Sequence, residues 1–347
     1  MGLLPKEVHS RPTLRSVIGV VLGTMAITGA INLAAVKLLE GSAYNSGYLR
    51  IQEAWSRLDG QDGPADWLVL GDSGCGNAVV PEILEQSLEG SVTHLCTIGN
   101  MGLLDDAWLL GAHIELYGPP GKGVLLVHVY DVWQRASPPV GLLAHVPRPL
   151  GFWKRFEPPV DLNWHEATDL FMARHLPLVG ARESVEDMVN GRIREFRGRD
   201  ERQVPGAEVA DTARVRSDFR NHVAHADSTR FAIAPKNLEA LDLIARLAID
   251  YEFDVYLANS PLWEGLAADP AYQEYASELE AVLTAYARDN FSVHQVTGTM
   301  TFGLRDMTRT VDHIQAGPAV RYSRDLATRV ADLRLARRFD PESIPAP

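Results

Sequence analysis

The chain opens on an uncharged apolar segment and continues with short apolar runs that alternate with longer periodic stretches. No charged residue occurs from Ser16 to Val36, and Lys37 closes the segment. A helix of this length, at roughly 1.5 Å per residue, reaches across the ~30 Å apolar core of a bilayer, which the shorter apolar region of a signal peptide would not need. The pattern predicts a transmembrane helix over residues 16–37.

The charges that flank this segment predict its orientation. Lys6, Arg11 and Arg15 precede it, and positively charged flanks stay on the cytoplasmic side of a membrane. Residues 1–15 are therefore expected inside, and everything after the helix outside. A cleaved signal peptide is the alternative, although no A-x-A cleavage site follows the apolar run.

The next stretch has the spacing of an amphipathic helix. Tyr48, Ile51, Trp55 and Leu58 recur at intervals of three and four residues, which places them on one helix face. Residues 38–64 are therefore expected to form a juxtamembrane helix and a linker. The helix is either a stalk or the first helix of the core.

Residues 65–133 predict the first part of an α/β domain. Short apolar runs of strand length alternate there with stretches of helical periodicity. A β-α-β-α-β order is typical of a parallel sheet covered by helices. The strands are expected at 67–70, 92–98 and 123–130, and the helices at 81–88 and 103–117.

The alternation stops and then resumes. Residues 134–235, rich in proline and including the charged stretch Arg192–Arg202, suggest an insertion of helices and loops that helps to shape a ligand site. Residues 236–340 complete the domain and 341–347 form a tail. The predicted fold is α/β: a three-layer parallel sheet with helices on both faces, one N-terminal transmembrane helix and a helical insertion. The second part is expected to contain helices at 237–251, 271–288 and 318–339, and strands at 254–258 and 291–296.

Charge and cysteine content exclude several classes of protein. With 33 Lys and Arg against 45 Asp and Glu, the net charge is -12, which repels nucleic acid. The two cysteines, Cys75 and Cys96, show no metal-ligand spacing. Buried thiols are favoured for them, although a chain outside the cytoplasm could pair the two.

The stretch Asp66 to Leu84 contains the leading candidate for chemistry. Its first strand stops at Gly71-Asp72-Ser73, and a proline-led helix start follows, so Ser73 lies on a tight strand-to-helix turn. A serine hydroxyl becomes a nucleophile when it is exposed, fixed, near a base and beside N–H groups that hold an oxyanion. Ordinary turn chemistry is the alternative reading of these residues.

Four loops are expected at the carboxyl ends of the strands, where open parallel sheets bind ligands. Together they offer a hydroxyl, a glycine turn with free N–H groups, polar side chains and an imidazole. The loops are Gly71–Ser73, Ile98–Gly102, Val129–Asp131 and Thr310–His313.

These blocks, in this order, resemble the SGNH, or GDSL-type, hydrolase superfamily. Within it, the chain is similar to membrane-anchored members that serve envelope O-acylation, such as alginate acetylation and teichoic-acid D-alanylation accessory proteins. The resemblance covers residues 65–133 and 237–337 and implies a flavodoxin-like sheet. It depends on Gly71-Asp72-Ser73, Gly99-Asn100, Asn259-Ser260-Pro261-Leu262, His313 and the Pro318–Ser323 block.

The resemblance implies roles for individual residues. Ser73 would be the nucleophile and His313 the general base, with Asp312 as the nearest carboxylate in the chain. The backbone N–H groups of Ser73 and Gly99, helped by Asn100, would form the oxyanion hole. Each aimed donor contributes on the order of 3 kcal/mol to such a transition state.

Two positions depart from the family pattern. Thr310 stands three residues before the histidine, where the family usually has an aspartate, so Asp312 is offered in its place. Tyr130 stands where the family has an oxyanion asparagine. Tyr130, with Asp72 and Asp131, is therefore an accessory candidate.

The resemblance also implies a function and partners. It implies serine-based O-acylation, with acetyl as the expected group, of a cell-envelope or exported polysaccharide, at the bacterial cytoplasmic membrane with the main domain periplasmic. A multi-pass membrane-bound O-acyltransferase would be the partner and a glycan the acceptor, with no cofactor and no metal. Gly19 and Gly23 form a G-x-x-x-G pattern that could seat the membrane helix against that partner.

Two other functions fit the same residues. A stand-alone carbohydrate or lipid esterase would use the same serine with water as acceptor. A non-catalytic scaffold of the same fold would bind glycan or hold a membrane complex together, and Thr310 and Tyr130 are the positions that favour it.

Overall fold

The computed structural model describes residues 14–39, 46–176, 179, 211–228 and 231–339. It contains two units, residues 1–44 with 171–199 and residues 45–170 with 200–347. The expectations for residues 1–13, the stretch Arg192–Arg202 and the tail 341–347 lie outside the described residues.

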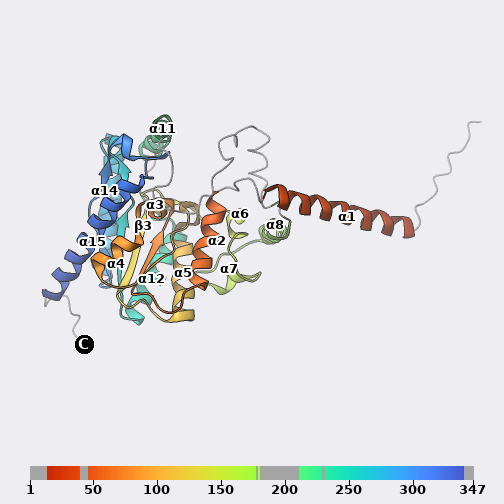
Figure 1. The fold of residues 1–347 in the computed structure, drawn as a ribbon, viewed down its shortest axis with the longest axis horizontal. Coiled ribbons are helices and arrows are strands. Elements are labelled where there is room, and N and C mark those ends of the chain that lie inside the picture. Colours follow the sequence, from red (N-terminus) through yellow and green to blue (C-terminus); the bar gives the residue numbers. More distant parts are fainter. Residues whose placement is uncertain (1–13, 40–45, 177–178, 180–210, 229–230, 340–347) are drawn as a thin grey trace, which may run out of the picture. The chain divides into compact units, whose positions relative to one another are not determined.

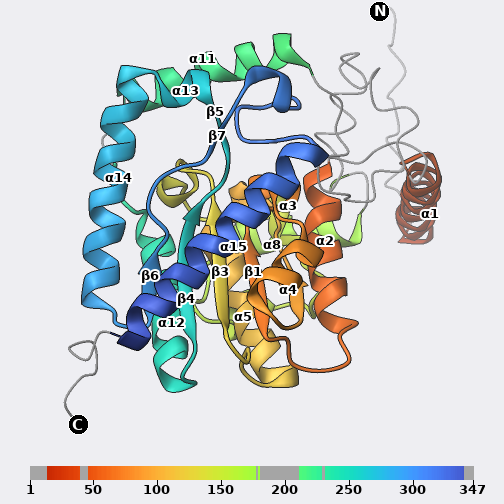
Figure 2. The ribbon, with the colours of Figure 1, turned by 60° about the vertical axis from the view of Figure 1, so that its left-hand side comes forward.

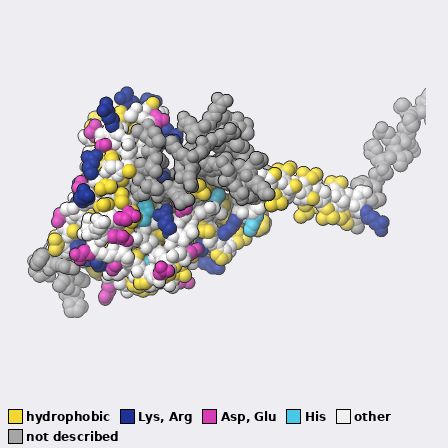
Figure 3. Space-filling view, in the orientation of Figure 1, with side chains coloured by type: hydrophobic (Ala, Val, Ile, Leu, Met, Phe, Trp, Pro, Cys, Tyr) yellow, Lys and Arg dark blue, Asp and Glu magenta, His cyan; other side chains and the backbone are white. Residues whose placement is uncertain are grey.

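Helix α1 (Leu14–Leu39) is the one helix of the described residues that is long and apolar enough to cross a membrane. Its stretch Arg15–Ala34 has a mean hydropathy of 1.9. Val20 and Leu33 are 68% and 70% exposed. Apolar side chains lie along the helix that Figure 1 labels α1 (yellow in Figure 3). A helix satisfies its own backbone hydrogen bonds and can therefore bury such side chains in lipid.

A parallel sheet forms the core of the larger unit. Its five strands lie in the order β2-β1-β3-β4-β6. The register aligns Leu68 with Val124 and Val124 with Val255, so all carboxyl ends meet at one edge. The strands are β1 (Trp67–Gly71), β2 (Val92–His94), β3 (Gly123–His128), β4 (Asp254–Asn259) and β6 (Val293–Gln295).

The central strands are buried on both faces. Every residue of β1 and β3 is buried, which is why both strands read as continuous apolar runs. β2 is shorter than predicted. Beyond it, the N–H groups of Leu95 and Thr97 still donate to the carbonyls of Val69 and Gly71, at 2.8 and 2.7 Å, so the chain continues alongside β1.

Helices flank the sheet, as the alternating pattern predicts. α15 packs against α3 (Ser73–Ala78) and α4 on one face, and α5 packs against α12 on the other (Figure 2). α14 lies along the edge strand β6. The predicted α/β class with a parallel sheet is therefore confirmed. The long helices are α4 (Pro81–Leu88), α5 (Gly102–Tyr117), α12 (Pro235–Asp250), α14 (Pro270–Asp289) and α15 (Ala316–Phe339).

The helix predicted after the apolar segment is α2 (Ser46–Asp59), and it belongs to the core. Ile51, Trp55 and Leu58 are fully buried, and the Trp55 indole donates a hydrogen bond to Asp105 at 3.1 Å. Of the two alternatives for this helix, a stalk would expose these side chains, so α2 is the first core helix.

The described part of residues 134–235 folds into helices and loops, as the proline content predicts. Its longest helix, α11, consists mostly of charged and polar residues of both signs. This helix packs against α14. The helices are α6 (Val140–Leu143), α7 (Phe152–Arg155), α8 (Trp164–His175) and α11 (Thr212–Ser228), after the short turn η2 (Val132–Gln134).

Two short strands were not predicted. β5 (Leu262–Trp263) and β7 (Thr301–Phe302) pair in parallel as a separate sheet. Each has two residues, too few to show a period of two in the sequence. β7 lies between the predicted strand at 291–296 and the predicted loop Thr310–His313, so this small sheet borders the segment that leads to His313.

The two cysteines are joined. Cys75, on α3, forms a disulfide with Cys96, which follows β2, so the free buried thiols favoured by the sequence are replaced by the pairing that it left open. His94 lies within 4.8 Å of both sulfur atoms. The set does not offer thiolate ligands to a metal, because the sulfurs are bonded to each other.

Loss of this disulfide is expected to lower the free energy of unfolding by about 3 kcal/mol, the value for a closed loop of this size, here a sequence separation of 21. The measurement is denaturant unfolding of the full-length chain in detergent micelles, with and without reductant. The Cys75→Ala/Cys96→Ala variant is the control and should match the reduced wild type in both conditions. If the unfolding midpoint of the wild type is the same with and without reductant, the disulfide does not stabilise the fold.

Candidate active site

Ser73 begins α3 directly after the end of β1. Gly71 has φ +149, and a Cβ there would lie 2.0 Å from the carbonyl oxygen of Val127. Only glycine lets the chain pass this close to β3. Asp72 caps α3, so Ser73 is its first residue rather than part of a loop, and its side chain is partly exposed.

Asp72 holds the turn together. Its carboxylate accepts hydrogen bonds from the N–H groups of Gly74 at 2.8 Å, Cys75 at 3.1 Å and Val129 at 2.6 Å. Its side chain is almost fully buried, and this burial raises its pKa although the hydrogen bonds oppose the shift. Asp72 therefore shapes the Ser73 turn and is not placed to contact a ligand.

A second buried carboxylate lies behind Asp72. His128 Nε2 lies 2.7 Å from Asp106, and His128 Nδ1 lies 3.8 Å from Asp72. Burial lowers the pKa of His128, but the neighbouring Asp106 outweighs it and raises this pKa. The three side chains form a buried cluster at the end of β3.

The structure brings His313 to Ser73. The His313 Nε2 atom lies 3.1 Å from Ser73 Oγ, within the range of a nucleophile and its base. The loop that carries His313 is closed by a bridge between Met307 and Ile314 and by a 2.9 Å bond from the Thr308 N–H to the His313 carbonyl. Two residues that are 240 positions apart thus form a hydroxyl–imidazole pair.

Asp312 lies on the serine side of the imidazole. Its carboxylate is 3.9 Å from His313 Nε2, the same nitrogen that faces Ser73, so it does not hold the ring through the opposite nitrogen. The hydroxyl of Thr310 is buried and has no hydrogen-bond partner in the described part of the chain. Neither residue occupies the usual place of an orienting carboxylate.

The two backbone N–H groups that the resemblance implies as oxyanion donors have no acceptor among the described residues. Within the described residues, the N–H groups of Ser73 and Gly99 donate to no acceptor. Ser73 is in the first turn of a helix, where N–H groups lack helical partners, and Gly99 is buried in the short turn η1 (Gly99–Met101). Unpaired buried N–H groups are rare in proteins, which makes Gly99 a candidate ligand contact.

Asn100 is fixed by a neighbouring ion pair. Its Oδ1 accepts a 2.7 Å hydrogen bond from Arg135, which also binds Asp131 at 2.8 Å. Burial alone would lower the pKa of Arg135, but the Asp131 carboxylate raises it. The chain Asn100–Arg135–Asp131 thus fixes the glycine turn beside the serine.

The carbonyl of Ser73 is held from the opposite side. Arg50 of α2 donates to it at 3.1 Å and Asn77 donates at 2.8 Å. Arg50 is 8% exposed, so these bonds lie in a dry environment. They fix the first turn of α3.

The hydroxyl of Tyr130 is engaged with His222 and does not serve as an oxyanion donor. Its hydroxyl is hydrogen-bonded to His222 Nδ1 at 2.6 Å, and its ring packs edge-on against Tyr272 and Tyr275 at centroid distances of 4.8 and 5.4 Å. Burial and the nearby Asp131 raise its pKa. The hydroxyl therefore stays protonated and serves the network around His222.

Two residues of this network were not singled out by the sequence as site residues. Asp218 and His222 lie four positions apart on α11, and their side chains are 3.4 Å apart. Asp218 also accepts the N–H of Val311 at 3.0 Å. Acidic and imidazole groups at this spacing share one helix face, and that spacing is the signal that could have found them.

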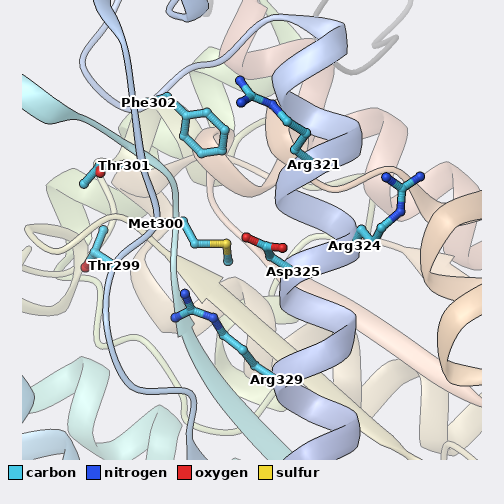
Figure 4. A pocket seen from close by; sticks show the side chains of 8 residues that line it. All are labelled: Thr299, Met300, Thr301, Phe302, Arg321, Arg324, Asp325 and Arg329. Atoms are coloured by element: carbon cyan, nitrogen blue, oxygen red, sulfur yellow. The ribbon is translucent and has the colours of Figure 1, made fainter.

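A cavity of about 440 Å³ lies between α15 and the segment that leads to His313. Figure 4 shows Asp325 and Arg329 pointing toward Met300, and Arg321 lying by Phe302. The Arg321 guanidinium is 5.3 Å from the centre of the Phe302 ring. The lining thus combines an aromatic face with charged hydrogen-bonding groups.

A scan against protein-family models found no match, and a search of curated proteins found none either. The chemistry of this site is therefore argued from its own geometry.

Proposed function

We propose that this chain is a membrane-anchored protein that moves an acyl group through Ser73, as its resemblance to SGNH-type hydrolases suggests. The observation that carries the proposal is the 3.1 Å approach of His313 Nε2 to Ser73 Oγ. The unpaired N–H groups of Ser73 and Gly99 support it, because acyl transfer needs donors for an oxyanion. A serine at an ordinary turn would lack the imidazole.

The proposed reaction has two halves. Ser73 Oγ attacks the carbonyl carbon of an acyl ester or thioester, His313 Nε2 takes the hydroxyl proton, and the N–H groups of Ser73 and Gly99 bind the oxyanion. As the intermediate collapses, the bond to the leaving group breaks and that group takes the proton from His313. An acceptor hydroxyl then attacks the acyl-serine while His313 takes its proton. As this second intermediate collapses, the bond from the acyl carbon to Ser73 Oγ breaks, and Oγ takes the proton back from His313.

The proposed location is outside the cytoplasmic membrane, with residues 1–15 inside. α1 supports an anchor, and the basic residues before it support the orientation. The Cys75–Cys96 disulfide supports an oxidising compartment. A multi-pass acyltransferase that brings acyl groups across the bilayer is the proposed partner.

The proposed acceptor is a glycan of the cell envelope. The cavity beside α15 supports this, because an aromatic face with nearby charged groups suits a sugar ring, which presents an apolar face and hydroxyls. The same segment that lines the cavity at Thr299–Phe302 continues to His313.

A fluorophosphonate probe tests the nucleophile in the full-length chain in detergent micelles. We expect covalent probe on Ser73, located by peptide mass spectrometry, and none on the Ser73→Ala variant. Ser277→Ala, which changes an exposed serine on α14, is the matched control and should label like wild type. A wild type that carries no probe on Ser73 would exclude serine-based acyl transfer.

A stand-alone esterase would give the same labelling, because it uses the same pair of residues. The acceptor separates the two functions. With p-nitrophenyl acetate as donor, acyl transfer to an added oligosaccharide gives an acetylated sugar by mass spectrometry, whereas an esterase gives acetate alone.

A further inference from the structure

We propose that Asp218 of α11 is the positioning carboxylate of the Ser73–His313 pair, and that His222 and Tyr130 hold it in place. The inference depends on the proposed function, because it assigns a role within that same site. It makes α11, an element of the insertion, part of the catalytic apparatus.

The first support is a continuous hydrogen-bonded chain. The Tyr130 hydroxyl is hydrogen-bonded to His222 Nδ1 at 2.6 Å, His222 Nε2 lies 3.4 Å from Asp218 Oδ2, and the N–H of Val311 donates to the same oxygen at 3.0 Å. In the neutral tautomer whose Nδ1 accepts from Tyr130, the ring carries its proton on Nε2, which faces Asp218. The chain links β3, α11 and the His313 loop.

The second support is the way the loop is held. Val311 lies two residues before His313 and is fully buried. Its N–H is bound by Asp218, and its carbonyl accepts the N–H of Trp263 at 2.7 Å. The two peptide groups that flank Val311 are therefore both held by hydrogen bonds. A misplacement of about 1 Å at a base can cost on the order of 100-fold in rate.

The third support is charge. Burial alone would raise the pKa of Asp218, but the hydrogen bond and charge of His222, the Val311 N–H and the charge of His313 lower it below its usual value. Asp218 therefore stays ionised. A negative charge at this place stabilises the imidazolium that forms when His313 takes the Ser73 proton.

Other titratable groups lie around Asp218 and His313 and contribute to the pH dependence of the proposed reaction. Asp312 lies on the loop of His313 itself, 3.9 Å from Nε2. Burial lowers the pKa of His222, but Asp218, followed by Asp312 and Asp131, raises it. The carboxylates thus favour the protonated form of His222, in which Nδ1 donates to the Tyr130 hydroxyl and Nε2 faces Asp218.

The test compares three variants of the full-length chain in detergent micelles. Asp218→Asn keeps an oxygen that can accept the Val311 N–H but removes the charge, and Asp218→Ala removes both. We expect Asp218→Asn to slow acylation of Ser73 by p-nitrophenyl acetate about 10-fold and Asp218→Ala about 100-fold, with KM nearly unchanged. Asp211→Asn is the matched control, because Asp211 caps the same helix through a 3.0 Å bond to the Arg214 N–H, and it should behave like wild type.

A second readout separates a positioning charge from a merely structural residue. We expect the acid limb of the acylation profile in Asp218→Asn, and the NMR titration midpoint of the His313 ring, to move to lower pH by about half a unit or more. Asp218→Glu, which restores the charge, should move both back toward wild type. Unchanged rate and unchanged midpoint in Asp218→Asn and Asp218→Ala would overturn the inference.

The two proposals fail in different ways. If the wild type carries no fluorophosphonate on Ser73, the acyl-transfer function fails, and the His313 titration still decides whether Asp218 acts on the imidazole. If Ser73 is labelled at the wild-type rate in every Asp218 variant and the titration does not move, the function stands and the role of Asp218 is rejected.

Discussion

Replacing His313 with glutamine is expected to slow acylation of Ser73 by about 10²- to 10⁴-fold, the range that a positioned general base contributes. Glutamine is similar in size and can still hydrogen-bond to the Ser73 hydroxyl, which lies 3.1 Å from the ring in the wild type. It cannot accept the proton at neutral pH. The change therefore removes the base and leaves the turn around Ser73 intact.

The measurement is the burst of p-nitrophenol released by the full-length chain, together with the mass of the acetylated Ser73 peptide. His294→Gln is the matched control. His294 has a comparable exposure, with 14% of its side chain accessible against 12% for His313, and also lies near a carboxylate, 3.1 Å from Asp254. A His313→Gln burst as fast as that of His294→Gln would remove His313 from the reaction.

The parts of the fold that the sequence predicts well are those with long, regular patterns. β1, β3 and β4 are buried runs between clear breaks. α12 shows the period of a helix packed on one face, and α5 is buried along most of its length. Such elements can be recognised in the sequence because burial restricts most of their positions to apolar residues, which leaves a regular pattern. The parallel arrangement follows from their alternation.

Short elements and long-range contacts were less accessible. α3 is a six-residue helix that contains two glycines, so intrinsic propensity argues against it, and the Asp72 cap and the packing of α15 stabilise it instead. The sequence left open whether Cys75 and Cys96 form a disulfide, because pairing depends on the distance between two elements of the fold. A two-residue strand such as β7 carries no period at all.

The same distinction between local sequence patterns and long-range contacts applies to the residues of the candidate site. The sequence singled out Ser73 and His313 because each was expected in a loop at a strand end, where an open sheet binds ligands. Asp218 and His222 were missed as site residues because α11 has no pattern that shows what it packs against, and only the fold brings it to Val311. The orienting role of Asp312 was favoured by its neighbouring position in sequence, but its carboxylate faces the nitrogen that also faces Ser73.

Replacement of Asp72 tests how much of the site depends on the turn that precedes the serine. Its carboxylate is the acceptor for three backbone N–H groups, those of Gly74, Cys75 and Val129. A buried donor that loses its acceptor costs about 1–3 kcal/mol, so Asp72→Ala is expected to lower the free energy of unfolding by roughly 3 kcal/mol or more. Labelling of Ser73 should be lost with it.

Asp72→Asn is expected to lie between wild type and Asp72→Ala. An asparagine oxygen can still cap Gly74 and Cys75, but its amide nitrogen would face the Val129 N–H, and two donors cannot bond to each other. Asp269→Ala is the control, because Asp269 caps α14 through one bond, 3.0 Å to the Ala271 N–H, and should cost about 1 kcal/mol. In denaturant titrations of the full-length chain, an Asp72→Ala loss no larger than that of Asp269→Ala would mean that the three bonds do not hold the turn. A loss several times larger, with Asp72→Asn between the two, would mean that one buried carboxylate fixes both the start of α3 and the end of β3, and so the position of Ser73 between them.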